Sequence, residues 1–163
     1  MNSPTNLRAR TSSASETQAA AAAIGHVCRP GDLLLLSGDL GAGKTTFTQG
    51  FARALGVTDP VTSPTFTLLN AYEGDVRVLH ADVYRMGALQ EVLDLGLHEA
   101  LDEGDIALVE WGDAASAALP TERLEIALSF GVGDDDRLLG LRPVGASWVD
   151  RTDALSRAVE PFT

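Results

Sequence analysis

The chain has 163 residues, of which 45% are hydrophobic and 21% are charged, and its formal net charge is −11. This length suits one domain with one hydrophobic core, and the composition excludes disordered, fibrous and membrane-embedded classes. No apolar run approaches the ~20 residues that cross a bilayer, and Met1 to Arg10 lack the apolar stretch of a secretion signal. We therefore expect a cytoplasmic protein that makes no membrane contact.

The acidic charge balance also disfavours direct, independent binding to RNA or DNA. Proteins usually meet nucleic-acid phosphates with clustered lysine and arginine side chains, whereas the average surface of this chain repels them. The 12 basic residues include a single lysine, Lys44, which lies in a glycine-rich segment. Chance alone would rarely place the only lysine there.

The first segment of the chain predicts a tail followed by a helix. Polar residues and Pro4 favour a flexible tail over residues 1–14. Ser13 and Glu16 have the spacing of a capping box, so we expect a helix that begins there and runs to about Val27.

A strand, a glycine-rich loop and a helix are expected next. Residues 33–36 are four consecutive leucines, which is typical of a strand buried on both faces in a parallel sheet. The glycine-rich segment 38–45 follows directly. Apolar residues then recur at helical spacing between Phe47 and Leu55, and Gly56 stands where a helix C-terminal glycine is expected.

The rest of the chain adds strands to this unit. We expect a hairpin of strands at 65–72 and 76–84, short helices within 88–101, a buried strand at 106–109 that ends at Glu110, closing strands at 124–130 and 138–141, and a helix at 148–159. The order of elements predicts an α/β protein with a P-loop NTPase-like three-layer fold and a mixed, mainly parallel central sheet. The expected boundaries are an ATPase domain at 15–144 and a helical C-terminal extension at 145–163.

The glycine-rich loop fits the Walker A pattern of nucleotide-binding proteins. Its glycines let the backbone wrap a phosphate with N–H groups, and the following helix directs its positive end at the same group. Lys44 is expected to neutralise the β and γ phosphates, the Thr45 hydroxyl to bind Mg²⁺, and Thr46 to donate to an inner phosphate. The sequence thus predicts a site for ATP and Mg²⁺ whose backbone lining comes from Asp39, Leu40, Gly41, Ala42 and Gly43.

ATP is favoured over GTP as the nucleotide. Guanine selection in small GTPases uses an Asn-Lys-x-Asp motif, and the only lysine of this chain is already in the phosphate-binding loop.

Two carboxylates embedded in apolar strands are candidates for the catalytic site. In these folds a carboxylate at the end of a neighbouring buried strand holds the metal, and Glu110 follows such a strand. Asp82 could orient the attacking water or assist the metal. Strand alternation places His80 on the same face as Asp82, where a packing role is favoured. Both carboxylates can also be read as ordinary strand residues.

Four segments together resemble the bacterial TsaE (YjeE) family: Ser37 to Thr46, Ser63 to Thr67, His80 to Arg85, and Val109 to Trp111. The resemblance spans about Glu16 to Arg142. Four motifs in the same order are much more specific than a Walker A loop alone.

The resemblance implies an ATPase, slow without partners, that supports threonylcarbamoyladenosine formation at position 37 of tRNAs reading ANN codons. It implies TsaD and TsaB as partners and contact with tRNA only through their complex. By motif, Thr45 and Glu110 become the Mg²⁺ ligands, and Asp82 joins Lys44 and Glu110 as a catalytic residue. Thr17 becomes a contact near the adenine, and Arg137 takes the late basic position of the family.

The sequence departs from the family pattern at two positions. Ala81 replaces a bulkier apolar residue, and Gly112 stands where proline is common. Neither change removes a reacting group.

Two other functions use the same loop. A small-molecule kinase would need an acceptor pocket and an arginine-bearing lid, whereas a nucleotide-gated scaffold would bind ATP and a partner with negligible turnover. ATP consumption without an added acceptor, and its stimulation by TsaB–TsaD, distinguish these classes from an ATPase.

Overall fold

The computed structural model describes residues 6–64, 68–83, 94, 96–110 and 119–163. In chain order, the helices and strands are β1 (Leu7–Thr11), α1 (Ala14–Gly25), β2 (Leu33–Ser37), α2 (Lys44–Ala54), β3 (Leu69–Tyr72), β4 (Val78–Asp82), α4 (Leu97–Asp102), β5 (Ile106–Glu110), β6 (Arg123–Phe130), β7 (Arg137–Val144), α5 (Ala146–Val149), α6 (Thr152–Val159) and the 3-10 helix η2 (Glu160–Phe162).

One sheet holds the seven described strands in the order β1-β7-β6-β2-β5-β4-β3. The central strands β6, β2, β5 and β4 are parallel, because the chain crosses between them through longer connections. Pairing is antiparallel at both edges, so that three of the six pairings are parallel and three are antiparallel. The predicted mixed α/β sheet is confirmed, with its parallel part confined to the centre.

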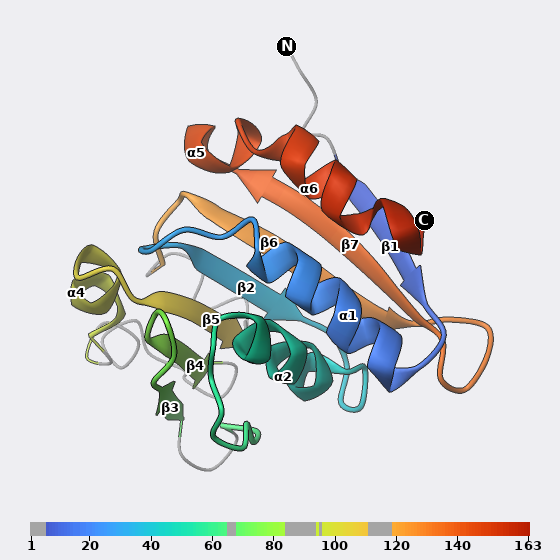
Figure 1. The fold of residues 1–163 in the computed structure, drawn as a ribbon, viewed down its shortest axis with the longest axis horizontal. Coiled ribbons are helices and arrows are strands. Elements are labelled where there is room, and N and C mark those ends of the chain that lie inside the picture. Colours follow the sequence, from blue (N-terminus) through green and yellow to red (C-terminus); the bar gives the residue numbers. More distant parts are fainter. Residues whose placement is uncertain (1–5, 65–67, 84–93, 95, 111–118) are drawn as a thin grey trace.

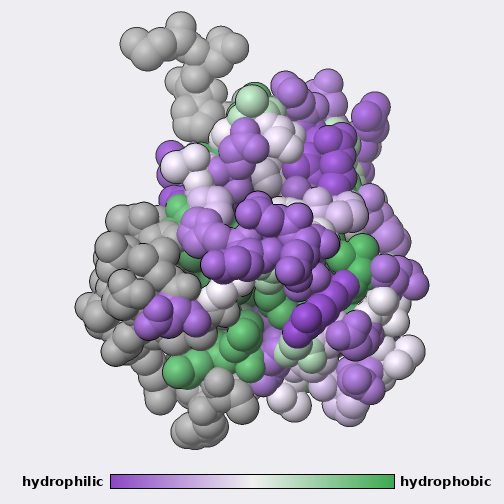
Figure 2. All heavy atoms as spheres, turned by 90° about the vertical axis from the view of Figure 1, so that its left-hand side faces the viewer, coloured by the Kyte–Doolittle hydropathy of each residue, from purple (hydrophilic) through white to green (hydrophobic). Residues whose placement is uncertain are grey.

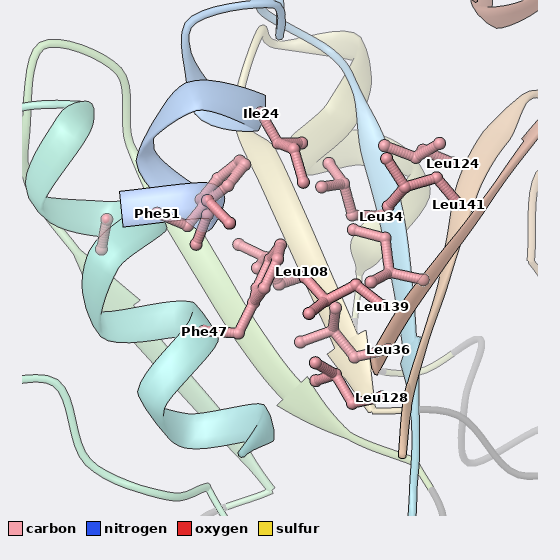
Figure 3. Packing of buried hydrophobic residues seen from close by; sticks show 14 of the residues in the cluster. Ile24, Leu34, Leu36, Phe47, Phe51, Leu108, Leu124, Leu128, Leu139 and Leu141 are labelled. Atoms are coloured by element: carbon pink, nitrogen blue, oxygen red, sulfur yellow. The ribbon is translucent and has the colours of Figure 1, made fainter. Parts of the chain in front are cut away.

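Helices cover both faces of the sheet and give the predicted three layers (Figure 1). On one face, Phe47 and Phe51 of α2 and Ile24 of α1 point toward leucines of β2, β5, β6 and β7 (Figure 3). The two helices approach so closely that a Cβ atom on Gly50 would collide with the carbonyl oxygen of Gln18. The opposite face of the central strands packs on Leu97 and Leu101 of α4, in a second core cluster.

The strand, loop and helix expected around the glycine-rich segment are confirmed. All four leucines of 33–36 are buried, and they alternate between the two core clusters. Helix α2 ends at Ala54, and Gly56 follows with a φ of +86°, as a helix C-terminal glycine does.

The N-terminal segment corrects one prediction. Residues 7–11, expected to belong to a flexible tail, form edge strand β1, which pairs antiparallel with β7. The strand has only five residues, and Ala9 and Thr11, which are buried, are small or polar residues that give little hydrophobic alternation against the two exposed arginines. One half of the predicted capping box is confirmed, since the Ser13 hydroxyl accepts the N–H of Glu16 at the start of α1, whereas the Glu16 carboxylate accepts the N–H of Ser12. The helix ends at Gly25, earlier than expected.

The C-terminal segment is also different from the expected single helix. It forms α5 and α6, separated at Arg151, and its residues Trp148, Leu155 and Val159 are buried in the main core cluster. Arg151 also makes a buried ion pair with Asp32, which precedes β2. Residues 145–163 are therefore an integral part of the domain and not an appended extension.

The described surface is mostly polar on the side that carries α4. Figure 2 shows hydrophilic residues over most of the described part of this side, with hydrophobic residues reaching the surface in smaller areas between them. None of the helices within the described ranges is long and apolar enough to span a bilayer.

Candidate nucleotide site

The loop after β2 adopts a backbone path that needs glycine. Gly38 has a φ of +153°, and a Cβ atom there would lie 2.6 Å from the carbonyl oxygen of Leu128 on β6. Gly43 has a φ of +105° and is the N-cap of α2. Side chains at these positions would strain the backbone or fill the loop, so both glycines keep the loop open.

Helix α2 begins without a side-chain cap. Gly43 offers no side chain to the first N–H groups of the helix, and no side-chain hydrogen bond caps it. The uncapped N–H groups and the positive end of the helix dipole together form a place for an anion. Thr45 and Thr46 are half-buried in this first turn, whereas Asp39, Leu40 and Gly41 are exposed at the tip of the loop.

Two contacts hold the shape of the loop. The buried residue Ala42 donates its N–H to the carbonyl of Asp39. The Lys44 ammonium group donates to the carbonyl of Gly38 at 2.7 Å, across the mouth of the loop. Lys44 is thus within the loop and close to the point at which β2 ends.

Asp82 and Glu110 end neighbouring parallel strands beside that loop. Asp82 of β4 is in register with Glu110 of β5, and Glu110 is in register with Leu36 of β2. Both carboxylate residues are buried, with 5% and 7% exposure. By strand alternation they share the face of Leu36 and Leu108, which is the face covered by α2. The structure therefore brings the two predicted carboxylates to the carboxyl ends of the parallel strands, where the loop also lies.

His80 lies directly against Glu110. Its Nε2 atom is 3.4 Å from Oε1 of Glu110, and its side chain is fully buried. Neither ring nitrogen has a hydrogen-bond partner within the described part of the chain. The expected packing role is therefore incomplete, because His80 places two open polar atoms beside a candidate catalytic carboxylate.

Arg137 comes to the loop from a distant part of the chain. Its Nη2 atom donates to the carbonyl of Gly41 at 3.3 Å, across 96 residues of sequence. Its guanidinium carbon also lies 4.9 Å from the centroid of the Phe130 ring, which is a cation–π contact. Phe130 was not predicted as a site residue. Its position beside Arg137 follows from the register of β6 with β7, which the sequence alone does not show.

Thr17 lies in α1, and its hydroxyl is already engaged. It forms a 2.6 Å hydrogen bond with the hydroxyl of Thr11 on β1, and both side chains are buried. This bond joins the edge strand to the first helix. Contact between Thr17 and a nucleotide stays a prediction.

Some residues of the family motifs lie outside the described residues, namely 65–67, Tyr84, Arg85, Trp111 and Gly112. Within the described ranges, no group of three or more His, Cys, Asp or Glu side chains forms a metal cage. The donors at the loop are instead a hydroxyl and buried carboxylates. Such a set suits Mg²⁺, which binds proteins through one or two carboxylates and completes its shell with phosphates and water.

Sequence comparison assigns the family. The family described as "Threonylcarbamoyl adenosine biosynthesis protein TsaE" matches residues 11–137. The protein named tRNA threonylcarbamoyladenosine biosynthesis protein TsaE from Bacillus subtilis is 45% identical over 152 residues, which cover 93% of this chain and 94% of the relative. The protein of the same name from Treponema pallidum is 36% identical over 122 residues, which cover 75% of this chain and 90% of the relative.

A solved structure agrees with the sequence relatives. The crystal structure of Bacillus subtilis YdiB matches with a TM-score of 0.81 and 40% identity, and the match covers 96% of this chain and 98% of that chain. Because so little of the chain is left uncovered, most of residues 145–163 have a counterpart there. The profile match, the relatives and the shared fold establish that this chain belongs to the TsaE family.

Proposed function

We propose that this chain is an Mg²⁺-dependent ATPase required for threonylcarbamoyladenosine formation at position 37 of tRNAs reading ANN codons. The relatives that carry the name of this biosynthesis support the pathway, since two of them match at 45% and 36% identity. The proposed setting is the cytoplasm, with TsaB and TsaD as partners.

The observation that carries the proposal is that the glycine-rich loop and two buried carboxylates lie together at the carboxyl ends of the parallel strands. The glycine loop and the uncapped start of α2 offer N–H donors and positive charge, while Glu110 and Asp82 bring buried carboxylates to the adjoining strands. A nucleotide triphosphate with Mg²⁺ suits both halves, because its phosphates need the donors and its metal needs the carboxylates.

The loop residues would bind and orient the triphosphate. Lys44 would exchange the carbonyl of Gly38 for the β and γ phosphates, and its charge would offset theirs. The backbone N–H groups from Asp39 to Thr46 would hold the phosphate oxygens, with the Thr46 hydroxyl at an inner phosphate. Arg137, bonded to the carbonyl of Gly41, would hold the loop and add a positive charge near it.

Thr45 and Glu110 would hold the metal when the nucleotide is present. Bound Mg²⁺ neutralises charge on the phosphates and helps to align the triphosphate with the attacking water. His80, whose Nε2 atom lies 3.4 Å from Glu110, would limit the movement of this carboxylate on one side. Asp82, one strand further, would orient the attacking water.

The acidic surface supports an indirect relation to tRNA. With a net charge of −11, the isolated chain is expected to bind bare tRNA poorly at physiological salt. An interface with a protein partner can be built from local contacts that do not depend on the overall charge of the chain. ATP binding would then change the affinity for the partner, and partner binding would change the affinity for ATP by the same factor.

Reconstituted tRNA modification tests the proposal. Purified TsaB–TsaD, the threonylcarbamoyl donor system and an unmodified tRNA transcript are incubated with ATP and Mg²⁺, with and without this chain, while ADP and modified nucleoside are measured. We expect modification over many cycles only when the chain is present, together with ADP formation without an added small acceptor. Modification that is complete without the chain would contradict the pathway assignment, and modification without ADP formation by the chain would indicate a scaffold.

A further inference from the structure

Three strands of the sheet expose one face that no described helix covers. Helices α1 and α6 lie on the near side of β1, β6 and β7 in Figure 1, over the main core cluster. On the other side, Arg8 and Arg10 of β1 are exposed, while their neighbours Ala9 and Thr11 are buried. On the same side of β6 and β7, Ala127, Ser129, Leu138 and Arg142 are exposed, whereas the Arg123 and Glu125 side chains are only 15% and 14% exposed.

Arginine side chains gather on this outward face. Strand register places Arg8 beside Gly140, Arg10 beside Leu138, and Arg142 beside Glu125. Arg123 belongs to the same face by alternation from Glu125. The face, which we call the arginine face, consists of Arg8, Arg10, Arg123, Glu125, Ala127, Ser129, Leu138, Gly140 and Arg142.

The charge of the arginine face is opposite to that of the whole chain. Four arginines face one glutamate, a net charge of +3, on a chain whose net charge is −11. Glu125 forms ion pairs with Arg123 and Arg142, with nitrogen-to-oxygen distances of 2.9 and 3.1 Å. Within the described ranges, no ion pair or side-chain hydrogen bond engages Arg8 or Arg10. Their charges are therefore available to a partner.

The shape of the face is suited to a flat partner. Its centre is made of small residues, Ala127, Ser129 and Gly140, and Ala127 and Ser129 are exposed. Leu138 adds an apolar side chain that is 41% exposed. A sheet in a three-layer protein ordinarily has such a face covered, and arginine is enriched at protein interfaces.

We infer that the arginine face docks a carboxylate-rich surface of a protein partner. Arginine binds carboxylates through paired N–H groups, and Arg8 and Arg10 are two residues apart on one strand, so both side chains leave the same face of the sheet. An RNA partner is less suited to the face. The face carries no aromatic side chain for base stacking, and the surrounding negative charge repels a long polyanion.

This docking surface is separate from the proposed nucleotide site. The site residues Asp82 and Glu110 share the sheet face covered by α2, whereas the arginine face is on the opposite side of the sheet. Docking there is therefore expected to leave basal ATP turnover unchanged, and its test does not depend on the proposed ATPase.

A charge-neutralising triple variant tests the inference. Wild-type chain, the variant Arg8→Gln/Arg10→Gln/Arg142→Gln and the control Arg29→Gln/Arg53→Gln/Arg157→Gln are titrated into a labelled hexaglutamate peptide, short enough to stay on the face, and into an unmodified tRNA transcript. The control arginines are also exposed, lie off this face, and change the net charge by the same amount. Fluorescence anisotropy is read at low and at physiological salt, and circular dichroism verifies the folding of each variant.

We expect wild-type chain to bind the hexaglutamate peptide, the face variant to bind it about 10-fold or more weakly, and the control to differ by less than about 2-fold. Absence of binding by the wild type, or equal losses in the two triple variants, would overturn the inference. Tighter binding of tRNA than of the hexaglutamate peptide, lost in the face variant only, would also overturn it and assign the face to phosphate groups.

Discussion

Two buried ionisable pairs lie at opposite ends of the parallel strands, and they differ in how completely their polar atoms are bonded. Asp32 and Arg151 meet at the amino end of β2, whereas His80 and Glu110 meet near the carboxyl ends of β4 and β5. Both pairs are almost inaccessible to solvent. Their burial is thus similar, and their hydrogen bonding is not.

The Asp32–Arg151 pair is saturated. Two guanidinium nitrogens of Arg151 donate to the carboxylate of Asp32 at 2.6 and 2.9 Å, and the N–H of Arg29 donates to the same carboxylate. Arg151 also donates to Ser147 and stacks 3.8 Å from the Trp148 ring centroid. Burial raises the pKa of the nearby Cys28 thiol well above its ordinary value, and the charge of Asp32 adds to this shift while Arg151 opposes it. The polar atoms of this pair are thus all bonded within the protein.

The His80–Glu110 pair is open. The two side chains touch at 3.4 Å, but neither ring nitrogen of His80 has a hydrogen-bond partner within the described residues. A buried polar group without a partner costs about 1–3 kcal/mol, so such a group needs an explanation. Ligands of α/β sheets bind outside the carboxyl ends of the strands, which is where this pair lies. The comparison teaches that all polar atoms of the Asp32–Arg151 pair, which holds the C-terminal helices, are hydrogen-bonded. The His80–Glu110 pair, beside the glycine-rich loop, keeps polar atoms without a partner among the described residues.

Breaking the saturated pair has the largest expected effect. We predict that Arg151→Ala lowers the free energy of unfolding by about 3–5 kcal/mol, because Asp32 is left as an uncompensated buried charge. Urea unfolding measures this loss, and Arg142→Ala, which breaks a more exposed ion pair, is the matched control at about 1 kcal/mol or less. ATP affinity of the folded Arg151→Ala protein should match wild type. A loss for Arg151→Ala no larger than that of the control would contradict the structural role of the pair.

Removing the carboxylate of the open pair should affect chemistry more than stability. We predict that Glu110→Ala reduces Mg-ATP turnover by about 100-fold and weakens ATP binding much less, because the loop N–H groups supply most of the binding. The free energy of unfolding should stay within about 1 kcal/mol of wild type, since no saturated network is broken. Glu160→Ala, at an exposed glutamate, is the control for both readings. Unchanged turnover, or loss of all ATP affinity, would count against the role of Glu110.

A neutral buried pair gives an intermediate case. Thr17→Val should cost about 1–3 kcal/mol, because it leaves the Thr11 hydroxyl buried without its partner. The double variant Thr11→Val/Thr17→Val should regain part of that loss in thermal or urea unfolding. ATP titrations of the same proteins separate the two roles of Thr17. A contact with the nucleotide predicts weaker ATP binding for Thr17→Val than for Thr11→Val, and equal affinities would remove that contact.

The smallest effect is expected at His80. Since its nitrogens make no hydrogen bond in the described structure, His80→Phe should lower the free energy of unfolding by less than about 1.5 kcal/mol. Turnover should fall by roughly 10-fold, because Glu110 loses the neighbour that positions it. Phosphate release and urea unfolding, measured on one preparation, give both numbers. Strong destabilisation with wild-type turnover in the surviving folded protein would identify His80 as a packing residue only.

Local patterns predicted the central fold well. The leucine run, the loop glycines and the spacing from Phe47 to Leu55 each carry their own signal, and the structure confirms the strand, loop and helix that they predict. Strand β1 was missed because five residues with exposed arginines give little periodicity, and only pairing with β7 orders them. The break between α5 and α6 was missed for a similar reason. It occurs at Arg151, whose partner is 119 residues away.

The arrangement of the candidate site was predictable in part. Lys44, Thr45 and the loop glycines belong to one contiguous motif, and Glu110 and Asp82 follow buried strands, so sequence reasoning could find them. The contact between His80 and Glu110 depends on the register of β4 with β5, and the approach of Arg137 and Phe130 to Gly41 depends on how β6 and β7 lie beside β2. Such long-range geometry has no local signature in one sequence.

Phosphate release from Mg-ATP by wild-type chain and by Lys44→Ala most directly tests the claim that the open end of the sheet is an ATPase site. Lys44 is the only lysine, and its ammonium group lies across the loop within 2.7 Å of the Gly38 carbonyl. We predict slow turnover by the wild type that requires Mg²⁺ and rises with TsaB–TsaD, and no turnover above background by Lys44→Ala at unchanged thermal stability. Turnover near the wild-type rate in folded Lys44→Ala protein would contradict the assignment of the site.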